Sequence, residues 1–388
     1  MKNLTILNEV LKQIDYEAKT KRYNGQDTPA EIAYNICNAA KAKGSGFICM
    51  DDKVLVYNGL YWVDITPILK VFLKAALQRY WQDEVKGSDR TAIDHLYKQF
   101  PYTTMCMNHD QADGKINFEN GTLDLTTHQL GAHNPNDYFR YVLPYAYDSS
   151  ATCPQFMKYL EEVLPEPEER MVIAEYIGYL FTPLKLEKVL FLHGSGLNGK
   201  SVLVDIIEAL LGHENVSHES LSDMCGENGG ANSRMNLLGK LLNTCSDVSA
   251  KAFQGDVFKR LASGEPISFK VLYQDVGTST DYAKQLFCLN ELPKTSDTSN
   301  GYFRRFLIAP FPVQIPKSKI NPKLAQEIIA TELPGIMNWV LEGRARLIRQ
   351  NAFTESKAMT NAVEEYRSRY VKKKQFKLWI PSTFKRNE

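Results

Sequence analysis

The sequence predicts an α/β protein with a parallel sheet, preceded by an α+β region and followed by helices. Residues 187–192 read as an apolar strand that leads through glycines into residues 201–211, where apolar residues recur at helical spacing. Strand-like and helix-like segments then alternate to about Phe311, as in parallel-sheet proteins. The third observation is helical periodicity near the C-terminus, in residues 322–331, 334–349 and 354–370.

The N-terminal part is expected to form a small α+β domain over residues 1–111. Residues 29–43 form an amphipathic pattern typical of a helix, and another helix is expected from Pro67. Short alternating runs between them predict strands, at residues 46–50, 53–57 and 60–63.

Residues 112–185 are expected to form a hairpin and a helical lead-in to the sheet. Residues 116–125 alternate about Asn120-Gly121, which is a strong hairpin signal. Helices are expected at 154–164 and 167–181, residues 186–315 should hold the parallel-sheet core, and residues 316–388 should form the helical end.

Composition excludes several protein classes. With 388 residues, 44% hydrophobic and 23% charged, the chain resembles an ordinary globular protein of two or three domains. Its formal net charge of +1 argues against a uniformly basic nucleic-acid binder. No apolar run is long enough to span a bilayer and no signal peptide is evident, so we expect a cytoplasmic protein. The seven cysteines are scattered without metal-ligand spacing and are expected to be reduced.

The segment from Gly194 to Ser201 matches the phosphate-binding pattern G-x-x-x-x-G-K-[ST]. Its glycines let backbone N–H groups surround phosphate oxygens, Lys200 supplies positive charge and Ser201 can bind magnesium. The alternative, a glycine-rich turn that spells the motif by chance, is disfavoured by the flanking strand and helix. The residues expected to bind the nucleotide are Gly194, Ser195, Gly196, Leu197, Asn198, Gly199, Lys200 and Ser201.

Hydrolysis needs further side chains around such a loop. Asp247 follows an apolar strand and is the candidate second magnesium ligand, although a helix-capping role is the alternative. Asn290 ends another strand, where its amide could orient the attacking water. Arg304 and Arg305 could stabilise charge on a transferring phosphate, or could form structural ion pairs.

These ordered motifs resemble those of superfamily 3 helicases of the phage and plasmid primase-helicase family, which includes poxvirus-type proteins. The resemblance extends from about Lys115 to Phe353. The family's G-x-G-x-N-G-K-S motif is met in full, its second motif falls on Asp247 where Glu is more usual, and its K-x-L-T-G-G-D motif appears, with changes, at residues 259–265. Its sensor asparagine and paired arginines correspond to Asn290 and to Arg304 and Arg305.

The resemblance implies an AAA+-like P-loop ATPase that uses ATP and Mg²⁺ and assembles as a hexameric ring on single-stranded or forked DNA. Translocation would run 3′ to 5′ in the replication of a phage or plasmid-like element. Each ATP would lie between subunits, with an arginine supplied by the neighbour. A channel hairpin would place Lys270 and Tyr273 on DNA, the alternative being an ordinary strand pair. Lys284 is a further candidate for DNA contact, or merely faces solvent on its strand.

Several alternatives stay open from the sequence. The protein could be an ATP-binding initiator or loader with little hydrolysis, or a P-loop kinase of a small metabolite. The basic C-terminal residues could contact nucleic acid or form a solvated tail. No primase module is recognisable, so a primase or polymerase would act in trans or belong to a longer parent chain, and the first domain could be a collar or a DNA contact.

Overall fold

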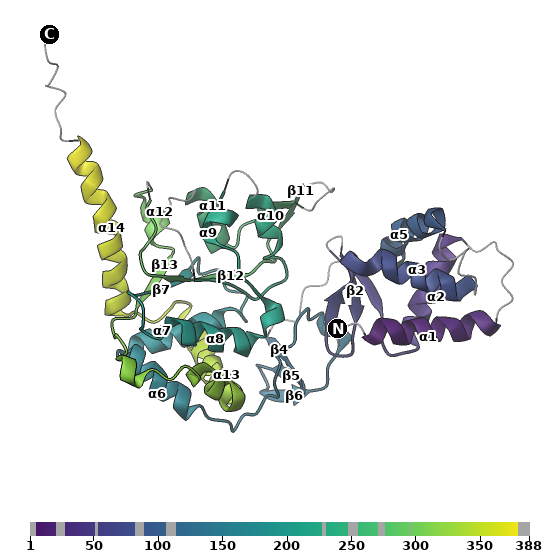
Figure 1. Cartoon of the computed structure of the whole chain (residues 1–388), viewed down its shortest axis with the longest axis horizontal. Helices are drawn as coiled ribbons and strands as arrows, with labels where there is room; N and C mark the ends of the chain where they lie inside the picture. Colours follow the sequence, from purple (N-terminus) through teal and green to yellow (C-terminus); the bar gives the residue numbers. More distant parts are fainter. Residues whose placement is uncertain are drawn as a thin grey trace, which may run out of the picture. The chain divides into compact units, whose positions relative to one another are not determined.

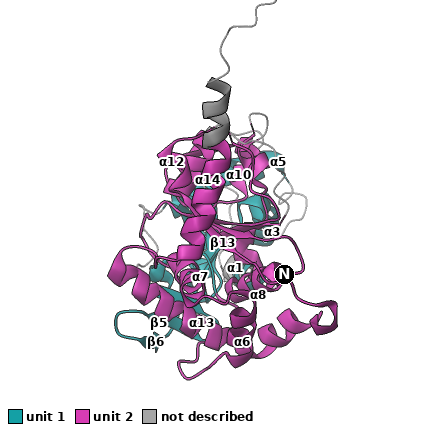
Figure 2. Ribbon diagram, turned by 90° about the vertical axis from the view of Figure 1, so that its left-hand side faces the viewer, with its two compact units in different colours: residues 1–142 teal, residues 143–388 magenta. Residues whose placement is uncertain are grey.

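The computed structural model describes residues 5–20, 28–50, 53–81, 89–105, 114–226, 230–246, 255–270, 276–295 and 297–378. Contacts divide the chain into two compact units, residues 1–142 and 143–388 (Figure 2). The first unit therefore extends past residue 111 and includes the hairpin. The four segments expected from the sequence stay a prediction at their finer boundaries.

The first unit combines helices with two small antiparallel sheets. Its helices are α1 (Thr5–Thr20), α2 (Pro29–Lys41), α3 (Leu69–Trp81) and α5 (Arg90–Thr104). Its strands are β1 (Phe47–Met50), β2 (Lys53–Tyr57), β3 (Trp62–Asp64), β4 (Lys115–Phe118), β5 (Gly121–Asp124) and β6 (Gln129–Gly131). Strands β1, β2 and β3 form one sheet and β4, β5 and β6 the other, each in chain order. The hairpin predicted at Asn120-Gly121 is confirmed, since β4 and β5 pair on either side of that turn.

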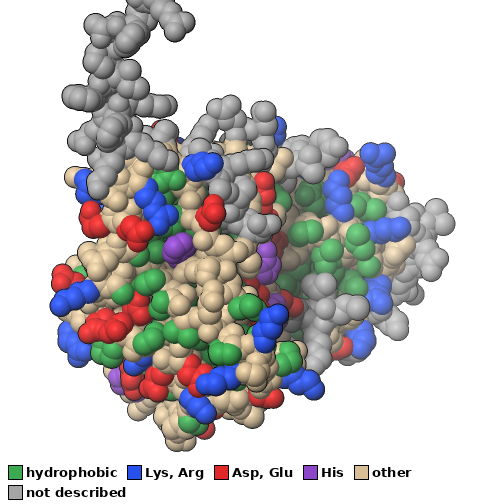
Figure 3. Space-filling view, turned by 60° about the vertical axis from the view of Figure 1, so that its left-hand side comes forward, with side chains coloured by type: hydrophobic (Ala, Val, Ile, Leu, Met, Phe, Trp, Pro, Cys, Tyr) green, Lys and Arg blue, Asp and Glu red, His purple; other side chains and the backbone are tan. Residues whose placement is uncertain are grey.

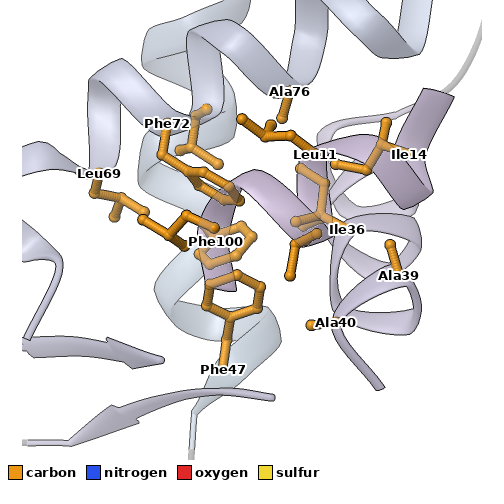
Figure 4. Close-up of a cluster of buried hydrophobic side chains, with 14 of the residues drawn as sticks. Leu11, Ile14, Ile36, Ala39, Ala40, Phe47, Leu69, Phe72, Ala76 and Phe100 are labelled. Carbon is orange, nitrogen blue, oxygen red and sulfur yellow. The ribbon is translucent and has the colours of Figure 1, made fainter. Parts of the chain in front are cut away.

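The core of the first unit lies between its helices and β1 (Figure 4). The ring of Phe47 meets that of Phe100 edge-on at 5.2 Å between centroids and lies 5.6 Å from that of Phe72. Helix α1 was not predicted from the sequence. Its buried Leu7, Val10, Leu11 and Ile14 nevertheless follow the i, i+3, i+4, i+7 spacing of a helix face, so the signal was present.

The second unit contains the predicted parallel sheet. Its strands are β7 (Val189–His193), β8 (Val216–Ser217), β9 (Leu242–Cys245), β12 (Lys284–Leu289) and β13 (Phe306–Pro310), in the order β13-β7-β12-β9-β8, all parallel. A separate antiparallel hairpin joins β10 (Ile267–Lys270) to β11 (Val276–Ser279). Stacked Phe191 and Phe306, 4.7 Å apart, are part of the core on one face of this sheet.

Helices cover both faces of the parallel sheet (Figure 1). They are α6 (Pro154–Val163), α7 (Pro167–Tyr179), α8 (Lys200–Leu211), α9 (Leu221–Met224), α10 (Gly230–Met235), α11 (Gly255–Ser263), α12 (Asn300–Phe303), α13 (Leu324–Gln350) and α14 (Lys357–Leu378). Helices α7, α8 and α13 lie on one side and α11 and α12 on the other. Among the helices described, none is long and apolar enough to cross a membrane.

One detail of the helical C-terminal region differs from the sequence prediction. We expected a break before Pro334, but α13 continues through it. Close packing against α7 explains how the helix persists, because tertiary contacts outweigh the bond that proline removes. A Cβ on Gly343 would lie 2.6 Å from the backbone of Ala174, and one on Gly335 would lie 2.2 Å from the carbonyl oxygen of Thr152.

Candidate nucleotide site

The phosphate-binding loop joins the end of β7 to the start of α8. Its backbone has positive φ angles at Gly196 (99°), Leu197 (51°) and Gly199 (86°), which is the region that glycine enters most easily. A Cβ at Gly194 would lie 2.2 Å from Nδ2 of Asn198 and 2.7 Å from the carbonyl oxygen of Phe311. The glycines are therefore required by the shape of the loop, and α8 directs its N-terminal N–H groups toward it.

The side chain of Lys200 is hydrogen-bonded to other residues of the phosphate-binding loop. Its Nζ donates to the carbonyl oxygen of Gly194 at 2.6 Å and to Oδ1 of Asn198 at 3.0 Å. Only 7% of the residue is exposed, and this burial lowers the pKa of its ammonium. A group of strong acceptors such as a triphosphate fits here, because phosphate oxygens would replace neutral carbonyls as partners of a buried charge. Ser201, the predicted magnesium ligand, is exposed beside it.

Neighbouring segments hold the loop in place. The hydroxyl of Tyr159 on α6 donates to the carbonyl oxygen of Gly199 at 2.8 Å, and the N–H of Ile315 donates to that of Leu197 at 2.8 Å. Gln314 reaches the hydroxyl of Ser195 at 3.3 Å. Tyr159 was not singled out by the sequence, because an aromatic residue on an amphipathic helix reads as an ordinary core residue.

Asn290 lies at the same edge of the sheet as the loop. It directly follows β12, whose Leu289 is in register with His193, and the N–H of Gly194 donates to the carbonyl oxygen of Leu289 at 3.1 Å. Asn290 is exposed. The structure therefore brings the predicted sensor beside the phosphate loop. Asp247 lies outside the described residues.

Arg304 and Arg305 lie at the opposite edge. Strand β13 runs parallel to β7 with Phe306 beside Val189 and Pro310 beside His193, so the arginines precede the start of β13. Four residue steps along a strand correspond to roughly 13 Å. Within one protomer the arginines are thus separated from the phosphate loop by at least the length of the sheet.

The two arginines have different surroundings. Arg305 has 9% of its side chain exposed, and its guanidinium donates to Oγ of Ser263 at 2.8 and 3.1 Å and to the carbonyl oxygen of Gly301. Arg304 has 55% of its side chain exposed and pairs with Glu187, which also lies 3.1 Å from Arg305. Arg305 thus connects β13 to the motif at residues 259–265, whereas Arg304 faces solvent.

The hairpin expected between that motif and the sensor strand is present as β10 and β11. Arg234 on α10, 8% exposed, anchors it by donating to the carbonyl oxygen of Ser268 at 2.7 Å and to that of Met224 at 2.6 Å. Lys270 is exposed at the end of β10, as DNA contact would require. Tyr273 lies outside the described residues.

Lys284 is placed differently from the other DNA candidates. It begins β12 and is half-buried, with its ammonium 4.1 Å from the centre of the Tyr179 ring. Burial, and secondarily Lys185, lowers the pKa of Lys284 to about 8. This position lies at the edge away from the phosphate loop, and DNA contact stays a prediction for this residue.

The basic C-terminal segment begins as part of the core. Tyr366 on α14 is 1% exposed, packs on β13 and donates from its hydroxyl to the carbonyl oxygen of Pro293 at 2.8 Å. Arg367 donates to Oδ1 of Asn300 at 2.6 Å. The solvated tail considered from the sequence therefore cannot include this turn of α14. On the face shown in Figure 3, basic and acidic side chains are interspersed over the described residues.

No cluster of three or more metal-binding side chains occurs in the described ranges, and the cysteines there are free. Burial raises the pKa of Cys288, in β12 beside the phosphate loop, to about 12. Cys153, Cys225 and Cys288 are buried, as expected of core residues, whereas Cys37, Cys49 and Cys245 are partly buried.

Two family models match the chain. A model described as D5 N terminal like matches residues 10–165, and a family of unknown function, DUF5906, matches residues 192–305. The second match contains the whole phosphate loop and ends at the arginine pair.

Two curated relatives are viral proteins. The chain is 24% identical over 214 residues to "Putative helicase L207/L206" of Acanthamoeba polyphaga mimivirus, covering 53% of this chain and 22% of the relative. It is 25% identical over 226 residues to "Putative helicase 121R" of Invertebrate iridescent virus 3, covering 55% of this chain and 24% of the relative. The chain thus spans less than a quarter of the length of these relatives.

Solved structures share the fold at low identity. The A form apo structure of the NrS-1 C-terminal region matches with a TM-score of 0.54 and 12% identity, covering 88% of this chain and 75% of that one. A further apo structure of the NrS-1 C-terminal region matches with a TM-score of 0.50 and 12% identity, covering 86% and 76%. These matches agree with the α/β fold of the second unit and with its helical end.

Proposed function

We propose that this chain, which is a primase-helicase-type protein of the phage and viral kind, is an ATP-dependent DNA helicase of the superfamily 3 type. It would act as a hexameric ring on single-stranded or forked DNA during cytoplasmic replication of a mobile element. The observation that carries the proposal is the placement of Lys200 and Arg304 at opposite edges of one sheet. A neighbouring protomer is needed to bring the two edges together.

In each composite site, one protomer would bind the nucleotide. The loop N–H groups and Lys200 would hold the triphosphate, and Ser201 with Asp247 would hold Mg²⁺. When bound, the metal ion would neutralise phosphate charge. Asn290 would orient the attacking water, because its exposed amide follows the strand that borders the loop.

The neighbouring protomer would supply Arg304. Its side chain is exposed, and its partner Glu187 is shared with Arg305, so Arg304 can exchange one carboxylate for a phosphate without leaving that carboxylate unpaired. Arg305 would be a positioning residue, since its guanidinium is committed to Ser263 and Gly301. Charge stabilisation by an arginine from a neighbour is a strong contribution in phosphoryl transfer.

Complementation between two inactive variants tests the shared site. Lys200→Ala removes the loop lysine and Arg304→Ala removes the arginine, so each variant alone should lack DNA-stimulated ATP hydrolysis. In mixed rings, a site is complete where the loop of an Arg304→Ala protomer, which keeps Lys200, faces a Lys200→Ala neighbour, which keeps Arg304. With random 1:1 mixing about a quarter of the interfaces are of this kind, so we expect about a quarter of wild-type turnover.

A failure to complement, with mixed rings demonstrated by native mass spectrometry, would refute the shared site. The loader alternative predicts that ATP binds but that single-stranded DNA does not stimulate turnover. The kinase alternative predicts turnover by a monomer without DNA. Duplex unwinding by the wild-type ring, with loading strand polarity varied, tests the helicase activity and its 3′ to 5′ direction.

A further inference from the structure

A second cationic cavity lies at the edge of the sheet away from the phosphate loop. It measures about 110 Å³ and lies where β12 begins, within the second unit. Three lysines line it, Lys185, Lys188 and Lys284, together with the hydroxyl residues Ser263 and Thr280. Among the described lining residues there is no Asp or Glu.

The lysines are not compensated by the contacts that the structure gives them. Glu187 lies between two of them in the sequence, but its carboxylate pairs with Arg304 and Arg305. Nζ of Lys188 donates to the carbonyl oxygen of Arg304 at 2.5 Å, and the ammonium of Lys284 lies on the Tyr179 ring. A carbonyl and an aromatic ring are weak partners for cations compared with an oxyanion.

This arrangement opposes stability at neutral pH. Burial lowers the pKa of both Lys188 and Lys284, which means that each charged ammonium is less well solvated in the folded chain than in water. A methionine at position 284 would fill similar space without that penalty. Titratable groups with unfavourable surroundings in a cavity are typical of functional sites.

We propose that this cavity binds a phosphate oxyanion supplied from outside the protomer, either by the DNA backbone or by the nucleotide of a neighbouring subunit. Two connections link the cavity to the surfaces proposed for these sources. Ser263 is bonded to Arg305, beside the arginine proposed to face a neighbour. Thr280 follows β11 at the end of the hairpin where Ser279 pairs with Ile267, and exposed Lys270 lies at the other end of the same hairpin. The site itself does not depend on the proposed ATP hydrolysis.

Inorganic phosphate tests the site directly. In the full chain carrying Lys200→Ala, which weakens the phosphate loop, isothermal titration at pH 7 and low salt should still detect binding. Adding Lys185→Gln or Lys284→Met should weaken it about tenfold, the effect of one lost charged hydrogen bond. Lys185 is exposed, so its substitution should leave the fold intact. Lys319→Gln, at an exposed position outside the cavity, is the matched control. Equal affinity in all these variants overturns the proposal.

Two further measurements with Lys185→Gln in the otherwise wild-type chain identify the source of the phosphate. If DNA supplies it, the slope of log K against log salt for a dT oligomer should fall by about 0.7 per contact. If a neighbour's nucleotide supplies it, that slope should stay constant while ATP turnover by the assembled ring falls. If neither quantity changes, the proposal is refuted even where free phosphate binds. Failed complementation of Lys200→Ala and Arg304→Ala would count against the shared ATP site without affecting the titration.

Discussion

Replacing each arginine of the pair separately should affect different properties, stability for Arg305→Ala and ATP turnover for Arg304→Ala. Arg305→Ala removes the donors of two bonds to buried Ser263 and of one bond to partly buried Gly301. Leaving the buried hydroxyl and carbonyl groups without these donors costs about 3 kcal/mol. For a unit of this size 1 kcal/mol corresponds to roughly 2–4 °C, so the midpoint should fall by roughly 6–12 °C.

Arg304→Ala should leave stability almost unchanged. The Arg304 side chain in its ion pair with Glu187 is more than half exposed, and such surface pairs contribute about 0–1 kcal/mol. Glu187 also keeps Arg305 as a partner. If Arg304 stabilises phosphate charge in a neighbour's site, ATP turnover should fall by about a thousandfold or more.

The assay pairs calorimetry or urea unfolding with DNA-stimulated ATP turnover on the same preparations. Arg305→Lys serves as the conservative variant, because lysine keeps the charge but cannot form the same set of bonds. The reasoning is refuted if Arg304→Ala unfolds as readily as Arg305→Ala, or if Arg304→Ala retains full turnover in assembled rings.

Three further predictions concern the framework of the second unit. Glu175→Ala should lower the free energy of unfolding, measured in urea, by about 3–5 kcal/mol. The fully buried Glu175 carboxylate pairs with Arg346 at 2.6 Å, and its removal would leave the charge of Arg346 unpaired. Glu342→Ala, at an exposed position, is the control and should change stability little. Gly343→Ala should also destabilise the second unit, since the added Cβ would lie 2.6–2.8 Å from atoms of Ala174 and Glu175. An unchanged unfolding midpoint would contradict this and show that α13 can move away from α7. The pKa of Lys284 is lowered from 10.5 to about 8 in the folded chain, so between these pH values the unfolded chain binds more protons. The free energy of unfolding should therefore rise by roughly 3 kcal/mol from pH 8 to pH 10.5. Lys284→Met should remove this rise, and an identical pH dependence in both proteins would contradict the prediction.

The local sequence determined the phosphate loop and the elements around it. Glycines with positive φ, a lysine at the start of a helix and an apolar strand are short-range features, so their positions could be predicted without knowing what packs on them. The parallel character of the sheet followed from alternating strands and helices. The continuous helix through Pro334 did not, because its stability comes from contacts with a helix about 160 residues earlier.

Only the tertiary structure separated the two arginines and assembled the lysine cavity. Arg304 and Arg305 are chemically identical neighbours, and their roles differ because β13 directs one toward Ser263 and leaves the other in solvent. Lys185 and Lys284 are about 100 residues apart and meet only because β12 pairs with β7. A sequence specifies which charges a chain carries, but strand order decides which of those charges share a cavity without a counter-charge.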